Sequence, residues 1–141
     1  MFNTVLVGAD DSETARRAVE AAAEIAKMSS GQLHIVSAFD PRTFSTSSVG
    51  GEFNGLTPES DIDALLQVLS FIAKKNGVEP VLHSVKGDPA EVVIDTANKI
   101  SADLVVVGNR GMKGVRRVLG SVPNSIAHGA PCSVLIVDTT D

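Results

Sequence analysis

Short apolar runs and longer stretches of helical periodicity alternate along this chain. The apolar runs are rich in valine, isoleucine and leucine, and each has the length of a β-strand. They span residues 4–8, 33–38, 81–85, 104–107 and 133–137. Between them, apolar residues recur at the spacing of an amphipathic helix, over residues 15–26, 62–73, 90–97 and 122–128.

This alternation predicts an α/β fold. Parallel strands cannot be joined by a tight hairpin, and a crossover helix between successive strands is their usual connection. Right-handed crossovers place helices on both faces of the sheet. We therefore expect a doubly wound, five-stranded parallel sheet with helices on both faces, a Rossmann-like architecture, formed as one domain over residues 1–141.

Local signals refine this picture. Residues 40–58 are rich in serine, threonine and glycine and carry no periodicity, so they predict a long mobile loop. Gly31 is expected to close the first helix. Pro89 suits the first turn of a later helix, with Asp88 as its cap.

Composition narrows the function classes. Asp and Glu (17) outnumber Lys and Arg (12), the net charge is −5, and Trp and Tyr are absent. A nucleic-acid partner is therefore not expected, because it would require a basic surface or aromatic stacking. The one cysteine, Cys132, precludes an internal disulfide and is expected to be a buried, inert thiol. No secretory leader or membrane-spanning run is recognisable, so we expect a cytoplasmic protein without a membrane partner.

The segment 108–121 carries the clearest chemical signal. It follows directly after an apolar strand and contains four glycines and four of the 12 Lys and Arg residues, and no acidic residue occurs from residue 104 to 137. Glycines let a backbone approach a ligand closely, and a helix N-terminus favours an anion. Ligands of parallel sheets bind at the carboxyl ends of strands, so the segment predicts a phosphate site. Its glycine spacing matches neither the P-loop nor the dinucleotide fingerprint.

With these residues, the chain resembles the universal stress protein family of small nucleotide-binding α/β proteins. ATP-binding members of that family carry a glycine, two residues, a glycine, nine residues, a glycine and then Ser or Thr. Gly108, Gly111, Gly120 and Ser121 match this order, with an eight-residue spacer in place of nine. The resemblance covers the chain apart from residues 40–58 and implies an adenine nucleotide alpha hydrolase-like fold.

The start of the chain also resembles the family, whose first strand is followed by Asp-Gly-Ser. Here Asp10 is followed by Asp11, so an additional negative charge stands where the family has glycine. The resemblance implies that Asp10 accepts hydrogen bonds from ribose hydroxyls or helps to hold Mg²⁺ through the phosphates.

The ligand that the resemblance implies is ATP, or else AMP or cyclic AMP. Small residues would lie against the adenine, glycines would line the ribose and phosphates, and backbone N–H groups at a helix start would donate to the phosphates. The implied binding residues are Ala9, Asp10, Ala38, Val107, Gly108, Arg110, Gly111, Gly120, Ser121 and Val122.

The resemblance further implies a stress-response regulator and a homodimer. The apolar strand at residues 133–137 gives the dimer a physical motive, because exposed edge strands tend to pair. We find no nucleophile–base pair, and His34, His83 and His128 are scattered along the chain. We therefore expect at most weak, incidental ATP hydrolysis and no enzyme function.

Three alternatives stay open. A slow ATPase would use the same site. A phospho-acceptor receiver-like domain would share the Asp10–Asp11 pair, but it also needs a Ser or Thr after the fourth strand and a Lys after the fifth, and it would have to use Asp88 as its phospho-acceptor. A flavin-binding electron carrier has the same class of fold, although the absence of Trp and Tyr disfavours ring stacking.

Overall fold

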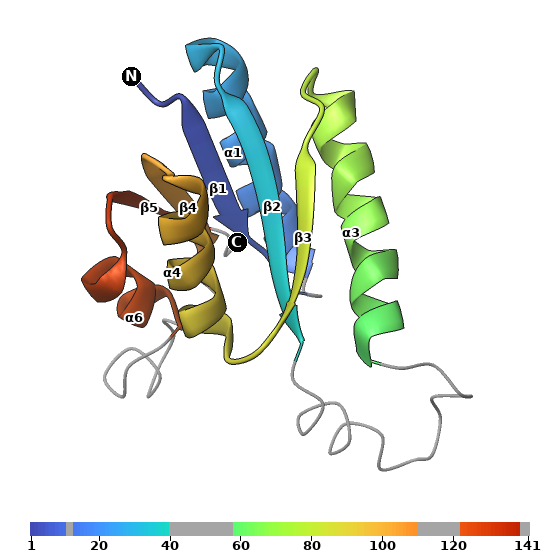
Figure 1. The fold of residues 1–141 in the computed structure, drawn as a ribbon. Coiled ribbons are helices and arrows are strands. Elements are labelled where there is room, and N and C mark those ends of the chain that lie inside the picture. The colour runs from blue at the N-terminus through green and yellow to red at the C-terminus, as the bar shows by residue number, and fades with distance from the viewer. Residues whose placement is uncertain (11–12, 40–57, 110–121, 139–141) are drawn as a thin grey trace.

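A computed structural model describes residues 1–10, 13–39, 58–109 and 122–138 of the chain. Its strands are β1 (Thr4–Gly8), β2 (Gln32–Phe39), β3 (Val81–Lys86), β4 (Leu104–Gly108) and β5 (Ser133–Val137). Its helices are α1 (Glu13–Ser29), α3 (Pro58–Lys75), α4 (Pro89–Ile100) and α6 (Val122–Gly129). Strands and helices alternate along the described chain, as the hydrophobic pattern predicts (Figure 1).

The five strands form one parallel sheet in the order β3-β2-β1-β4-β5. The chain moves outward from β1 through β2 to β3, and it then crosses back to β4 on the other side of β1. Helices α1 and α3 consequently pack on one face and α4 and α6 on the other (Figure 1). The predicted doubly wound α/β fold is confirmed, and the order of the strands reverses between β1 and β4.

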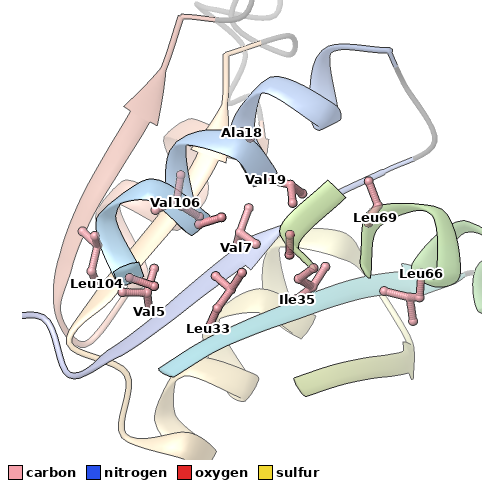
Figure 2. Packing of buried hydrophobic residues seen from close by; sticks show 14 of the residues in the cluster. Val5, Val7, Ala18, Val19, Leu33, Ile35, Leu66, Leu69, Leu104 and Val106 are labelled. Atoms are coloured by element: carbon pink, nitrogen blue, oxygen red, sulfur yellow. The ribbon is translucent and has the colours of Figure 1, made fainter. Parts of the chain in front are cut away.

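Two apolar clusters hold the helices against the sheet. Val5 and Val7 of β1 point into the cluster beneath α1 and α3, whereas Leu6 between them points into the cluster beneath α4 and α6. Figure 2 shows the first cluster, in which Leu33 and Ile35 of β2 lie beside the β1 valines. A central strand covered on both faces must be apolar at every position, which explains the unbroken hydrophobic runs of β1 and β4.

Helix α3 begins earlier than the sequence periodicity predicts. Its first residue is Pro58, which the sequence assigns to the preceding loop, whereas the apolar repeat starts only at Ile62. Proline fits the first helical turn because its missing N–H has no partner there in any helix. The rest of the predicted loop, residues 40–57, lies outside the described residues.

The end of α1 is closed at the predicted place, but by a different residue. Ser30 adopts the left-handed conformation, with φ of 54°, and the N–H of Gly31 donates to the carbonyl of Ala26 at 2.8 Å. This is a Schellman closure with serine in the position that glycine usually occupies. Glycine is needed at position 31 for a different reason, because a Cβ there would overlap the backbone carbonyl of Phe2.

We therefore expect Gly31→Ala to lower the free energy of unfolding by about 1–3 kcal/mol, the usual range for overpacking. Gly129→Ala is the matched control. Its Cβ would lie 2.7 Å from Cδ1 of Ile94, the end of a flexible side chain that can rotate away. Urea denaturation of both variants measures the loss. Equal stability of the two would show that the carbonyl of Phe2 does not restrict the side chain at position 31.

Candidate functional site

A cavity of about 180 Å³ lies at the carboxyl ends of β1, β2 and β4. It opens at the point where the strand order reverses, which is where parallel α/β sheets usually bind ligands. The described residues that line it come from these three strands, from the turn after β1, and from helices α1, α4 and α6. They are Gly8, Ala9, Asp10, Thr14, Ala15, Val36, Ala38, Pro89, Val93, Val107, Gly108, Val122, Pro123 and Ile126.

The last residue of β1 lets α4 approach the sheet closely. A Cβ on Gly8 would lie 2.8 Å from Cγ2 of Val93, a separation that real side chains do not tolerate. Glycine at this position therefore allows Val93 to pack against the end of β1. The result is an apolar wall on the α4 side of the cavity.

The turn after β1 is held by β2. The N–H of Ala9 donates to the carbonyl of Val36 at 3.0 Å, and the hydroxyl of Ser37 donates to the carbonyl of Ala9. Ser37 is only 1% exposed, so this hydrogen bond is shielded from water. Both polar groups of the Ala9 backbone are thus satisfied by one neighbouring strand, which fixes the turn that lines the cavity.

The walls of the cavity differ in character from its edge. Val36, Val107 and Ile126 are buried and provide an apolar floor, whereas Asp10 and Val122 are exposed. Among the described lining residues, Asp10 is the one ionisable side chain. Such a site can bury a flat, weakly polar group and leave a polar or charged remainder at the edge.

The turn before α4 is built for capping. Gly87 has φ of 143°, and its N–H donates to the carbonyl of Phe39 at 2.9 Å. The carboxylate of Asp88 accepts from the N–H of Glu91 at 3.2 Å, and Pro89 follows in the first turn. The predicted cap is confirmed. Because the Asp88 carboxylate caps its own helix, it is a poor candidate for a phospho-acceptor.

The cavity brings together the sequence-predicted site residues that the structure describes. The predicted residues that line it are Ala9, Asp10, Ala38, Val107, Gly108 and Val122. The other four, Arg110, Gly111, Gly120 and Ser121, lie outside the described residues, as do the neighbouring basic residues of segment 110–121.

Sequence reasoning missed several lining residues. Val36 could have been found, because it lies two positions before Ala38 on a strand and therefore shares its face. Val93 and Ile126 carry no such signal. Both read as ordinary core positions of their helices, and only the packing of α4 and α6 against the sheet brings them to the cavity.

A model of the universal stress protein family matches residues 1–138. The chain belongs to the universal stress protein family. Universal stress protein YxiE of Bacillus subtilis (strain 168) is 32% identical over 149 residues, which cover 97% of this chain and 99% of that protein.

Solved structures of this family have the same fold. A universal stress protein crystallised in complex with cAMP is 33% identical, with a TM-score of 0.82, and the match covers 99% of this chain and 98% of that one. Universal stress protein UspA from Lactobacillus plantarum is 26% identical with a TM-score of 0.73, covering 96% and 97% of the two chains. None of the described helices of this family member is long and apolar enough to cross a membrane.

The sheet topology separates this family member from two of the alternatives. Receiver domains and flavodoxins place β1 between β2 and β3, in the order 2-1-3-4-5. Here β1 pairs with β2 and β4, and β3 is an edge strand. The receiver-like interpretation is therefore wrong on topology, and so is a flavin carrier of the flavodoxin type.

Two of the histidines are not scattered, contrary to the sequence interpretation. His34 and His83 lie on neighbouring strands, and Nδ1 of His34 is 2.9 Å from Nε2 of His83. Nε2 of His34 donates to Oε1 of Gln32 at 3.0 Å, so its Nδ1 accepts from His83. The pair spans two strands and does not line the cavity. Its histidines satisfy each other, which is a packing role.

The remaining reactive side chain is not poised for chemistry. Cys132 is half-buried, and burial, followed by the nearby Asp103 carboxylate, raises the pKa of its thiol. A raised pKa keeps the thiol protonated, in agreement with the expected inert role.

Within residues 1–10, 13–39, 58–109 and 122–138, no three His, Cys, Asp or Glu side chains gather in a way that could hold a metal ion.

The histidine pair predicts a loss of stability in mild acid. Burial lowers the pKa of His34 and of His83 below 6.5, and the charges of His83 and Lys99 respectively lower them further. The unfolded chain therefore binds protons more readily than the folded chain. The contribution of the pair to stability is fully present above pH 6.5 and is lost as the pH falls through the lowered pKa values.

The double substitution His34→Gln and His83→Gln should reduce this pH dependence. Urea denaturation at about pH 7.5 and about pH 5.5 measures it as the difference in the free energy of unfolding. The difference should be smaller in the double variant than in the native chain. An equal difference in both proteins would contradict the role assigned to the pair.

Proposed function

We propose that this chain binds an adenine nucleotide in the cavity between β1, β2 and β4, and that it acts as a cytoplasmic stress-response regulator. ATP is the ligand we favour, with AMP and cyclic AMP next. The observation that carries the proposal is the cavity itself, which joins the described residues implied by the family motif. A family member with 33% identity, crystallised with cAMP, supports the same ligand class.

The size and polarity of the cavity suit the base of a nucleotide. Whole ligand pockets usually enclose roughly 300–1,000 Å³. The present 180 Å³ is smaller and mainly apolar, which fits an adenine ring between Ala9, Ala38 and the floor valines. The ribose and phosphates would then lie toward the exposed Asp10 and Val122.

The far edge of the cavity suits the phosphates. Val122 is the first residue of α6, and helix starts present free N–H groups and a positive dipole end to an anion. The glycine-rich segment 108–121 leads directly into this helix start. With nucleotide bound, any Mg²⁺ would be held mainly by the phosphates, and the Asp10 carboxylate would accept hydrogen bonds from the ribose hydroxyls.

The same residues support a binding role more than an enzymatic one. Hydrolysis of ATP requires a group that orients the attacking water and contacts that strengthen in the transition state. The described lining offers one carboxylate, Asp10, and one hydroxyl, Thr14. In the proposed pose Asp10 lies at the ribose, far from the terminal phosphate. We therefore propose that bound nucleotide is retained as a signal and that turnover is at most weak.

Filling the cavity should abolish binding without unfolding the protein. Ala38→Leu adds a branched side chain where the adenine would lie, so the affinity for ATP should fall by at least about ten-fold. Ala21→Leu is the matched control, since Ala21 is also half-buried but does not line the cavity. Calorimetric titration with ATP, AMP and cAMP gives the affinities and their order. Unchanged ATP affinity in folded Ala38→Leu would reject the site.

Two further measurements on these samples complete the test. Mass spectrometry of ligand released from the purified native chain identifies the nucleotide that it carries. Phosphate release from excess ATP should stay below the ~1 s⁻¹ low end of enzyme turnover. Steady turnover above that value, lost in Asp10→Asn, would replace the binding role with the ATPase alternative.

We also propose that two copies pair through β5. This strand is hydrogen-bonded to β4 along one edge, and among the described residues no strand covers its other edge. Leu135 is 38% exposed on it, and exposed apolar edge strands tend to pair with another chain.

Leu135→Lys should therefore convert dimers to monomers, because it places a charge in the proposed contact. Light scattering measures the mass, with Ser133→Thr as a control that keeps the strand uncharged. A Leu135→Lys protein that remains dimeric would show that the β5 edge is not the interface.

A further inference from the structure

Helix α3 exposes two large apolar side chains to solvent. Phe71 is 66% exposed and Val68 is 44% exposed. At 100° per residue, the exposed positions of α3 form one continuous face with Phe71 at its centre. We call this surface the α3 face; its exposed members are Asp63, Ala64, Gln67, Val68, Phe71, Lys74 and Lys75.

Charges flank the α3 face with opposite signs at its two ends. Asp61 and Asp63 lie toward the N-terminal end of α3, whereas Lys74 and Lys75 form its last turn. At 100° per residue, Asp63 and Lys74 fall on one flank of Phe71, and Asp61 and Lys75 fall on the other. Each flank therefore runs from a carboxylate to an ammonium along the helix.

We propose that the α3 face binds the α3 face of a second copy of this chain, with the two helices antiparallel. A two-fold axis perpendicular to the helices brings like flanks together and reverses their direction. With that axis near Val68, Asp61 and Lys75 lie about 10 Å to either side of it, at 1.5 Å per residue. Asp61 of each copy then stands opposite the partner's Lys75, and Asp63 is offset from the partner's Lys74 by about 1.5 Å along the helix axis.

The apolar centre is complementary in the same register. The partner's Phe71 falls between the levels of Ala64 and Val68, where the small alanine leaves space for a ring. A parallel arrangement would instead place carboxylate against carboxylate and lysine against lysine. Charge and shape thus select an antiparallel second copy, which is the reason to prefer it over an unrelated partner.

The ion pair that Lys74 already makes within the chain does not oppose this pairing. Nζ of Lys74 lies 3.4 Å from Oε2 of Glu79, and both side chains are mostly exposed. Exposed ion pairs of this kind contribute about 0–1 kcal/mol, so Lys74 can exchange one carboxylate for another at little cost. We expect the association of two copies through the α3 face to be weak, and added salt should weaken it further.

The α3 face and the β5 edge lie on opposite sides of the molecule (Figure 1). They can therefore be occupied at the same time, and two different two-fold contacts on one chain generate tetramers or longer assemblies. The α3 pairing does not depend on nucleotide binding or on the β5 contact, so its test is separate from theirs.

Charge reversal tests the α3 pairing through a pair of matched variants. The first carries Asp61→Lys and Asp63→Lys, and the second carries Lys74→Glu and Lys75→Glu. Alone, each places like charges together and should associate about ten-fold more weakly than the native chain at low salt. Mixed in equal amounts, the two variants restore every opposite-charge contact. Sedimentation equilibrium should then recover native association, which also demonstrates that both variants are folded.

Phe71→Ser removes the apolar centre and should weaken association as much as either charge-reversal variant does when it is measured alone. Asp95→Ser, on an exposed position of α4 across the sheet, is its control and should change nothing. A mixture no heavier than its separate components would overturn the proposal. So would a native chain whose association is insensitive to both salt and Phe71→Ser.

Discussion

The pairing of β1 between β2 and β4 is the constraint on which this molecule depends. Parallel hydrogen bonds hold β1 on both edges, through registers that include Val7 with Ile35 and Val7 with Val106. The helices that follow β1 and β4, α1 and α6, pack on opposite faces of the sheet. A gap therefore has to open between them, and the cavity is that gap. Its position follows from topology before any side chain is considered.

What lines the gap is mostly backbone and small apolar groups. The hydroxyl of Ser37 and the carbonyl of Val36 satisfy the Ala9 backbone, and the absence of a Cβ at Gly8 admits Val93. Apart from the Asp10 carboxylate, the described lining groups cannot take up or release a proton. The proposed retention of a ligand matches this lining better than turnover does.

The periphery of the sheet carries the surfaces available for assembly. At one side β5 pairs with β4 alone among the described strands, and at the other α3 exposes Phe71 to solvent. Both surfaces are apolar at the centre. Of the two, the α3 face is the one flanked by opposite charges along its length. These charges would fix the direction of a partner helix, and the apolar centre would supply the contact. The two proposed contacts would join copies of the chain at opposite edges of the sheet.

Features set by near neighbours in the chain were predictable from the sequence alone. The strands, the Asp88 cap and the doubly wound class follow from periodicity, turn chemistry and the handedness of crossovers, which act over a few residues. The resemblance to the family also predicted binding residues that line the cavity, namely Ala9, Asp10, Ala38, Val107, Gly108 and Val122. The start of α3 was misplaced because Pro58 precedes the first apolar repeat and reads as loop.

Features that join distant parts of the chain were decided by the tertiary structure. His34 and His83 are 49 residues apart and meet only because β3 pairs with β2 in one particular register. Ser30 closes α1, whereas the residue after it must lack a side chain because of the backbone carbonyl of Phe2, which precedes β1. Val93 and Ile126 reach the cavity because α4 and α6 pack on the same face of the sheet. Such contacts depend on strand register and on helix packing, and neither leaves a local pattern in the sequence.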